Sequence, residues 1–198
     1  NMSGKSTYIR QIGILVLMAQ IGCYIPASFA EIGIVDRIFT RVGLEDDLSE
    51  GRSTFMTEML ETSLILNEAT DRSLIILDEI GRGTSTYDGL AIAMSVAEHI
   101  HESKNLKSRT LFATHFHEMT SLESDMERIK NYYVSVVEDG DKVVFLHDIK
   151  RGISERSYGI YVAELAGMPR EVIHKSKLLL ANLESKSDFS FENIPEQL

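Results

Sequence analysis

The chain begins with a run of small and polar residues that matches the end of a phosphate-binding loop. The motif is G-x-x-x-x-G-K followed by Ser or Thr, and the run that matches it consists of Asn1, Met2, Ser3, Gly4, Lys5, Ser6 and Thr7. In such a loop, backbone N–H groups and a helix N-terminus point at phosphate oxygens. Lys5 is expected to reach the β- and γ-phosphates and the Ser6 hydroxyl to bind Mg²⁺. Because this loop joins a strand to a helix, it constrains the fold more than any other feature.

The motif is incomplete, since its first glycine and the strand that normally precedes it are missing from the sequence. We therefore expect the chain to be a fragment of a longer protein, with weak or no activity when isolated. A short Gly-Lys-Ser-Thr run is by itself a weak signal, because polar turns before helices are common. Two later strand ends that carry acidic and histidine side chains strengthen it.

Composition fits a globular chain of one domain, or one domain plus an appendage. The 198 residues are 43% hydrophobic and 25% charged, and the formal net charge is -10. A wide DNA-binding face would normally carry a basic excess. If the parent protein binds DNA, we expect its main DNA-binding surface to lie outside these residues.

The single cysteine and the absence of long apolar runs indicate in which cellular compartment the protein is expected. Cys23 cannot form an intrachain disulfide, which suits a reducing cytosol, and its apolar neighbours predict a small core residue. No run is long and apolar enough to span a bilayer. The expected location is the cytoplasm or nucleoid, or the nucleus if the source is eukaryotic.

Apolar patterning alternates between helical and strand-like segments. Helices are predicted over residues 8–21, 54–69, 88–101, 155–165 and 169–184, strands over 38–42, 74–77 and 110–114, and a hairpin over 132–137 and 142–146. Residues 74–77 are an all-apolar run typical of a strand buried on both faces, and residues 110–114 are predicted as another buried strand. The alternation of helices with buried strands predicts an α/β fold with a mainly parallel sheet and helices on both faces.

Two adjacent carboxylates follow the most apolar strand. Asp78 and Glu79 come directly after residues 74–77, at the strand end where open α/β sheets bind ligands. Asp78 suits Mg²⁺ binding, directly or through water, and Glu79 suits polarising the water that attacks the γ-phosphate. Two acids can also simply open a solvated turn, but the phosphate-binding loop argues against that. Nucleoside kinases need no such Glu.

A histidine ends the next strand. His115 follows residues 110–114 and should face the same sheet edge, where it can sense the γ-phosphate or orient the water. A polar strand cap is the alternative, and the location favours function. His117 lies outside the strand and is given no role. His99, His101 and His174 fall on helices and are predicted to be surface residues.

Residues 51–56 precede the second helix. Ser53 or Thr54 is an ordinary N-cap candidate, with Met56 and Met59 predicted in the core. A second anion-binding helix start in one domain supports a different role for Ser53, which is completion of a partner's nucleotide site in a head-to-tail dimer.

Five motifs occur in the order seen in the ATPase domain of the MutS DNA mismatch repair family, which the chain resembles over residues 1–184. The matching stretches are residues 1–11, 53–59, 78–89, 113–118, and 156–160 together with 165–169. Lys150-Arg151-Gly152 departs from the Pro-Gly turn more usual in that family. The family's mismatch-reading, connector, lever and clamp regions are not in this sequence.

The resemblance implies a P-loop NTPase fold of the ABC type over residues 1–150, a helix-turn-helix dimerisation region over 151–184 and a polar tail over 185–198. It further implies composite sites for ATP and Mg²⁺ in a dimer with a second MutS-type subunit. Asn1 would contact the nucleotide near the γ-phosphate, His147 would stack on adenine, and Ser53 would reach the partner's γ-phosphate. The helix-turn-helix would pack on the other subunit rather than read DNA.

The resulting hypothesis is an ATP-hydrolysing domain that switches its parent between mismatch-bound and sliding-clamp states. Mismatched DNA, bound through upstream regions, and a MutL-type protein are the further partners that the resemblance implies, and no membrane is expected. A transporter or chromosome-condensation ATPase is disfavoured because Leu-Ser-Gly-Gly is absent. The other alternative is the ATPase and dimerisation module of a MutS relative that acts in recombination without mismatch recognition.

Overall fold

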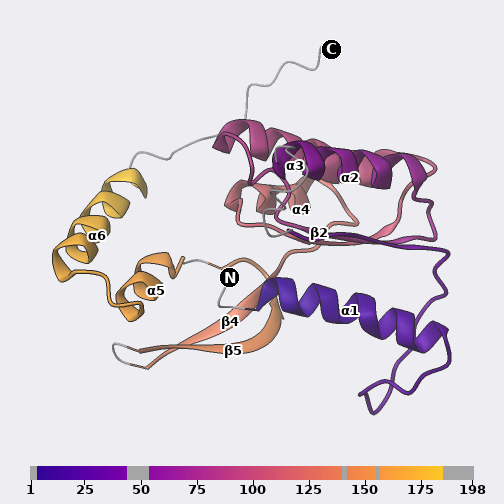
Figure 1. Ribbon diagram of the computed structural model, residues 1–198, viewed down its shortest axis with the longest axis horizontal. Helices are drawn as coiled ribbons and strands as arrows, with labels where there is room; N and C mark the ends of the chain where they lie inside the picture. Colours follow the sequence, from indigo (N-terminus) through magenta and orange to yellow (C-terminus); the bar gives the residue numbers. More distant parts are fainter. Residues whose placement is uncertain (1–3, 44–53, 140–141, 155–156, 185–198) are drawn as a thin grey trace. The chain divides into compact units, whose positions relative to one another are not determined.

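A computed structural model describes residues 4–43, 54–139, 142–154 and 157–184 (Figure 1). The chain divides into two compact units, one of Asn1–Val137 with Val144–Ile153 and one of Glu138–Val143 with Ser154–Leu198. The first unit holds the parallel sheet and the second holds the two C-terminal helices. Each unit is described by itself.

The sheet of the first unit is parallel, as the sequence predicts. Its strands are β1 (Ile38–Arg41), β2 (Leu74–Asp78) and β3 (Arg109–Ala113), in the order β1-β2-β3. The register pairs Ile76 with Thr40 on one side and with Leu111 on the other. All five residues of β2 are buried, whereas β3 is only partly buried because β2 flanks it on one side alone. The prediction that residues 110–114 form a buried strand is therefore wrong for all of them except Ala113.

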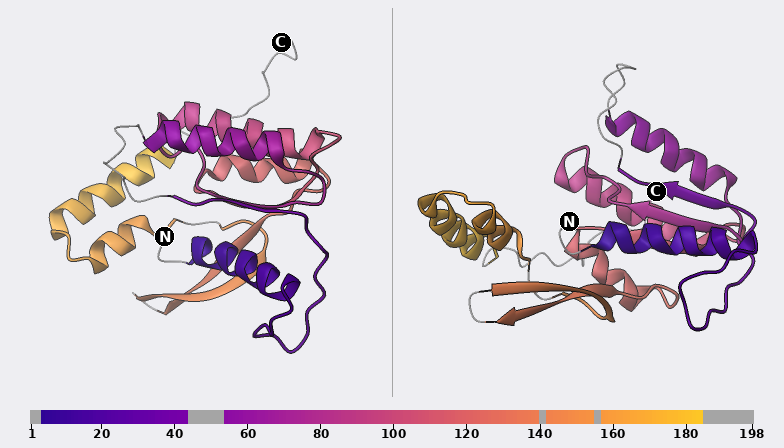
Figure 2. Two further views of the ribbon diagram at one scale, coloured as in Figure 1. Left: turned by 45° about the vertical axis from the view of Figure 1, so that its right-hand side comes forward. Right: turned by 60° about the horizontal axis from the view of Figure 1, so that its bottom comes forward.

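Helices cover both faces of this sheet, which confirms the predicted α/β class. Helix α1 (Lys5–Gln20) lies on one face, and α2 (Thr54–Glu68) and α3 (Thr86–Glu102) lie on the other (Figures 1 and 2). Successive β2 side chains point to opposite faces. Leu74 and Ile76 pack with Ile9 and Val16 of α1, while Ile75 and Leu77 belong to the core under α2 and α3.

The segment after β3 contains helical turns that the sequence analysis did not predict. A 3₁₀ helix, η1 (His117–Ser121), runs into the short helix α4 (Leu122–Asp125). Their apolar side chains Met119 and Leu122 join the core beside Phe116 and Met126. The spacing of these four residues is the signal that could have revealed the turns.

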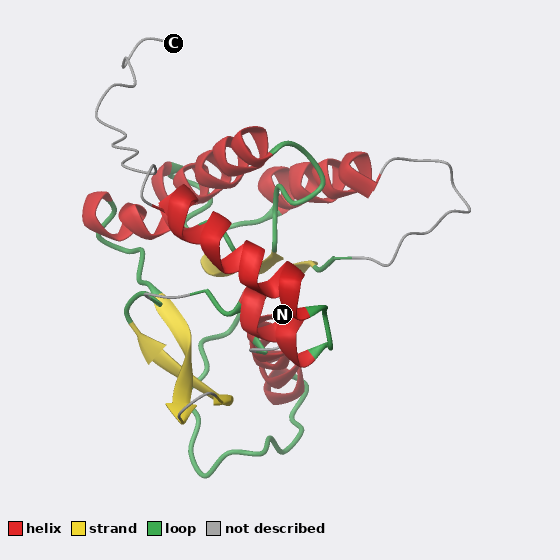
Figure 3. Cartoon of the chain, turned by 90° about the vertical axis from the view of Figure 1, so that its left-hand side faces the viewer, coloured by secondary structure: helices red, strands yellow, loops and turns green. Residues whose placement is uncertain are grey.

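The hairpin predicted around Asp139-Gly140 is present and longer than expected. It consists of β4 (Tyr132–Asp139) and β5 (Lys142–Arg151), which pair with each other as a two-stranded sheet (Figure 3). The Gly152 N–H donates to the Asn131 carbonyl at 2.9 Å, which closes the open end of the hairpin.

The second unit contains two C-terminal helices, α5 (Gly159–Leu165) and α6 (Arg170–Glu184). Lys177 Nζ lies 3.2 Å from Glu164 Oε2, which joins the two helices. The Pro169 carbonyl accepts from the N–H groups of Val172 and Ile173, so Pro169 immediately precedes α6. The predicted helix start at residue 155 lies outside the described residues.

Three predictions about single side chains are wrong. Cys23 is exposed, because the chain leaves the core at Gly22 once α1 has ended. Met56 is 55% exposed, since it lies on the outer side of α2. The His101 side chain at the end of α3 is only 15% exposed, so most of it is covered. Among the described residues, no helix has the length and apolar character needed to cross a membrane.

Candidate functional site

The start of α1 lies at the carboxyl ends of the parallel strands. Gly4 adopts a left-handed conformation with φ 85°, and its carbonyl accepts from the Tyr8 N–H at 2.9 Å, so the helix begins directly after it. The Lys5 ammonium donates to the Thr114 carbonyl at 2.8 Å, just beyond the end of β3. Thr7 lies exposed in the first turn, and Asn1, Met2 and Ser3 fall outside the described residues.

Ser6 and Asp78 meet at the end of β2. The Ser6 hydroxyl donates to Asp78 Oδ1 at 2.8 Å, and the Arg10 guanidinium lies 3.0 Å from Asp78 Oδ2. The Asp78 side chain is only 4% exposed, so these two partners compensate a buried charge. Arg10 was not predicted, although its position one helical turn after Ser6 places both residues on one side of α1.

This pair of oxygens fits a magnesium ion. A hydroxyl and a carboxylate are hard oxygen ligands, and Mg²⁺ is usually held by one or two carboxylates together with water and substrate phosphates. Within the described part of the chain, no group of three or more His, Cys, Asp or Glu residues could hold a metal ion. A site completed by phosphate and water therefore suits these residues better than an all-protein cage.

Glu79 has an unusual backbone conformation. Its φ of 58° is in the left-handed region, and its N–H donates to the Ala113 carbonyl at 2.8 Å. The Glu79 carboxylate pairs with Arg82, and the Glu79 side chain is 15% exposed. Non-glycine residues in this region cost about 1–3 kcal/mol and concentrate at functional sites. The sequence predicted the carboxylate but neither its backbone strain nor its Arg82 partner.

His115 lies in the electrostatic environment of Glu79 and Lys5. Desolvation lowers the pKa of His115 below its ordinary value of 6.5, and the Arg82 and Lys5 charges lower it further, while Glu79 opposes them. This lowered pKa favours the neutral form of the imidazole at pH 7. Its ring lies 4.3 Å from that of Phe116, measured between centroids. A neutral imidazole can both accept and donate a hydrogen bond, as orienting a water requires.

The structure brings His147 of β5 to the phosphate-binding loop. His147 Nδ1 would lie 3.0 Å from a Cβ placed on Gly4, so a side chain at position 4 would crowd the imidazole. His147 also has a positive φ of 54°. Residues 143 positions apart in sequence thus share one corner of the site, which no local pattern could have predicted. Ser53 lies outside the described residues.

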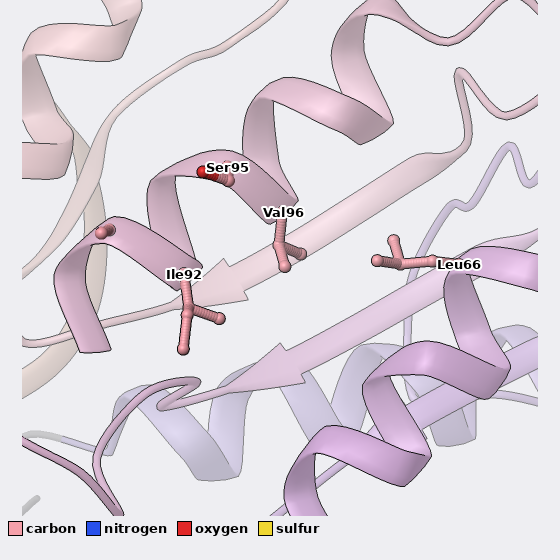
Figure 4. Close-up of a pocket in the computed structure, with 5 residues that line it drawn as sticks. Leu66, Ile92, Ser95 and Val96 are labelled. Atoms are coloured by element: carbon pink, nitrogen blue, oxygen red, sulfur yellow. The ribbon is translucent and has the colours of Figure 1, made fainter. Parts of the chain in front are cut away.

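An apolar hollow between α2 and α3 lies apart from these residues (Figure 4). Its lining is Leu66, Ala91, Ile92, Ser95 and Val96. It contains no charged side chain and none of the residues described above. A phosphate group would find no compensating charge there, so the candidate site is the edge of the sheet where α1, β2 and β3 meet.

Comparison with known proteins places this site in a family context. Residues 1–184 match the family described as MutS domain V. The chain is 58% identical over 186 residues to a DNA mismatch repair protein MutS of Chloroflexus aurantiacus, a match that covers 94% of the chain and 19% of that protein. It is 59% identical over 186 residues to the Chlorobaculum tepidum protein of the same name, covering 94% and 21%. A Methanococcoides burtonii protein with this name is 55% identical over 193 residues, covering 98% and 22%. The chain thus spans about a fifth of the length of these relatives.

Proposed function

Because the chain belongs to the MutS domain V family, we propose that it binds ATP with Mg²⁺ at the edge of its parallel sheet and hydrolyses the γ-phosphate in the service of DNA mismatch repair. One observation carries this proposal. The hydroxyl that follows the phosphate-loop lysine lies 2.8 Å from the carboxylate that ends β2, although 72 positions separate the two residues.

Lys5, Ser6 and Asp78 form the part of the site that holds the triphosphate. The Lys5 ammonium donates to the Thr114 carbonyl, a neutral acceptor that a charged phosphate oxygen would replace. Ser6 and Asp78 would supply oxygens to Mg²⁺, which would neutralise charge on the phosphates. Arg10 then holds Asp78 in place through its other carboxylate oxygen.

Glu79 and His115 form the part that acts on water. The left-handed backbone of Glu79 turns the chain at the end of β2, and its carboxylate would accept a proton from the attacking water. Arg82, which pairs with this carboxylate, must release it or shift for the water to be reached. Neutral His115 would donate a hydrogen bond to the γ-phosphate or orient the water.

The base and the partner subunit complete the proposed site. His147 beside Gly4 would stack on adenine, and Asn1 would contact the nucleotide near the γ-phosphate. Ser53 of a second MutS-type subunit would reach the same phosphate, so that two chains share each site. ATP binding would thereby be coupled to association and to the mismatch-bound and sliding-clamp states of the parent, with mismatched DNA and a MutL-type protein as its partners.

The test separates ATP binding from hydrolysis in the intact protein. Glu79→Gln keeps the size and hydrogen-bonding reach of the side chain but cannot act as a base, so we expect near-normal ATP affinity and turnover reduced about a hundredfold or more. Lys5→Ala removes a phosphate contact and should weaken ATP binding itself. Fluorescent ATP titration and phosphate release measure the two effects. Full turnover in Glu79→Gln would show that another group is the base.

A further inference from the structure

We propose that Glu58 of α2 is a positioning residue for Glu79, because its buried carboxylate fixes the backbone of the turn that follows β2. This inference deepens the proposed function and rests on it. Glu58 Oε1 accepts from the Gly81 N–H at 2.6 Å, two residues after Glu79 and across 23 positions of sequence. Glu58 lies within the motif of residues 53–59, but that motif does not show that its carboxylate contacts the turn after β2.

The surroundings of Glu58 make its carboxylate a fixed point. Glu58 is 5% exposed and Arg41 is 6% exposed, and Arg41 Nη2 lies 3.5 Å from Glu58 Oε2. Arg41 is held in turn by Glu61, at 3.2 Å from its Nε, and by the Val42 carbonyl. A buried carboxylate with both oxygens engaged has little freedom to move. Its bond to Gly81 is therefore a rigid link between α2 and the turn.

The turn itself requires such a link, because it departs from regular structure twice. Glu79 has φ 58° and Gly81 has φ 86°, so two of the three consecutive residues 79–81 are left-handed. Gly81 also packs backbone to backbone on Gly89 of α3, where a Cβ on Gly81 would lie 2.3 Å from the Gly89 carbonyl oxygen. The α3 contact fixes one side of Gly81 and the Glu58 carboxylate fixes its N–H. Between them they determine where the Glu79 side chain begins.

The same link joins the turn to the first turns of α2. Helix α2 begins at Thr54, directly after Ser53, and Glu58 lies just over one turn into it. Phe55 of the first turn also contacts the loop, since a Cβ on Gly83 would lie 3.0 Å from the Phe55 Cβ. A displacement of the first turns of α2 would therefore move Gly81 and, with it, Glu79. Glu58 is the residue through which a partner engaged at Ser53 would reach the water-activating carboxylate.

A purely structural role is the alternative, in which Glu58 only neutralises Arg41. The test compares two Glu58 variants of the intact protein, and both also carry Arg41→Met, so that neither has an Arg41 charge to neutralise. The variants are called the Gln arm and the Met arm after the residue at position 58. There Glu58→Gln keeps an oxygen for the Gly81 N–H, whereas Glu58→Met has a similar shape and no acceptor. We expect kcat in the Met arm to be about tenfold or more below the Gln arm, with KM for ATP unchanged, because displacing a catalytic group by about 1 Å can cost on the order of a hundredfold.

Two further measurements keep the result decisive. Amide hydrogen exchange at Gly81 should be faster in the Met arm than in the Gln arm, and this readout does not require hydrolysis.

Ser73→Ala is the control for lost stability. Ser73 is fully buried and donates to Asp36 at 2.8 Å at the start of β2, away from the turn, so this variant should be less stable with kcat unchanged. If the Glu58→Met protein does not fold, Glu58→Asp in the presence of Arg41 keeps the negative charge but shortens the side chain that reaches Gly81, and should show the same loss of kcat.

Equal kcat in the two arms, equal Gly81 exchange, or a Glu58→Asp protein with wild-type kcat would each overturn the positioning role. Failure of the proposed function looks different. A wild-type protein that does not hydrolyse ATP, or a Glu79→Gln protein that does so normally, would overturn the proposed chemistry, while Gly81 exchange would still decide whether Glu58 fixes the turn.

Discussion

The three charged residues of the candidate site, Lys5, Asp78 and Glu79, each have a partner of opposite charge or a hydrogen-bond acceptor. Asp78 is matched by Arg10, Glu79 by Arg82, and the Lys5 ammonium by a carbonyl. Pairing each charge in this way offsets the cost of removing it from water. Binding of a triphosphate would exchange these partners, so the site is expected to change its contacts more than its backbone.

His115 provides a prediction at this scale. Its pKa lies below 6.5 because of desolvation, and Glu79 is the group that most opposes the decrease. Glu79→Gln should therefore lower the pKa of His115 further, and Arg82→Gln should raise it. NMR titration of the imidazole, assigned with a His115→Asn variant, measures both changes. Shifts in the same direction in the two variants would contradict the placement of His115 between these charges.

The sign of the associated stability change follows from the same shift. A histidine with a lowered pKa in the folded state binds protons more readily when the chain is unfolded. Its contribution to folding is therefore favourable above pH 6.5 and declines as the pH falls from 6.5 toward the folded-state pKa. His115→Asn should weaken this dependence of the unfolding free energy on pH, and a denaturation series between pH 5 and 7 would detect the change.

Among the elements, the contact of α1 with β2 places Ser6 and Asp78, two residues of the proposed site. Gly13 lies in the middle of α1, where a Cβ would approach Ile76 Cδ1 to 2.6 Å. Ile76 is fully buried and cannot yield easily. The missing side chain at Gly13 thus lets the helix lie close to the strand, which sets the distance between Ser6 near its start and Asp78 at the strand end.

Substitution at Gly13 tests that packing. Gly13→Ala gains about 1 kcal/mol of helix propensity but should still destabilise the fold, because overpacking a core costs about 1–3 kcal/mol. In an Ile76→Val background the Cδ1 atom is gone, and the same Gly13→Ala change should become neutral or stabilising. Urea denaturation of the four proteins completes the cycle. A destabilisation of equal size in both backgrounds would place the conflict elsewhere.

At the scale of the whole molecule, the acidic net charge of -10 agrees with our proposal that this domain serves DNA repair without being the main DNA-binding surface of its parent. The chain spans about a fifth of its relatives, as 19% in one and 22% in another illustrate. Recognition of mismatched DNA therefore belongs, in our proposal, to other parts of the parent.

The proposal that two subunits share each ATP site leads to a prediction about the dimer. If Ser53 completes the partner's site, Ser53→Ala should lower turnover and leave monomer ATP affinity nearly intact, and ATP should favour association by linkage. In a mixture with Lys5→Ala subunits, one site of each mixed dimer combines both defects and the other has neither. Part of the activity should then return. A mixture no more active than its separate components, with mixed dimers shown to form, would assign Ser53 to its own helix start.

The sequence by itself determined the order and type of the main elements and the residues at the strand ends. Periodicity and turn residues are local properties, and they are enough to predict the parallel α/β class, the hairpin and the location of Lys5, Asp78, Glu79 and His115. The sequence did not predict the exact ends of the elements or the helical turns after β3, because those turns are only four or five residues long.

Only the tertiary structure decided which of those residues meet, and under what strain. The bond between Ser6 and Asp78, the approach of His147 to Gly4 and the link from Glu58 to Gly81 each depend on how distant elements pack. The exposure of Cys23 depends on where the chain leaves the core. The physical reason is the same in every case: propensity and hydrophobic period act over a few residues, whereas contacts between elements are fixed by register, close packing and the satisfaction of buried charge.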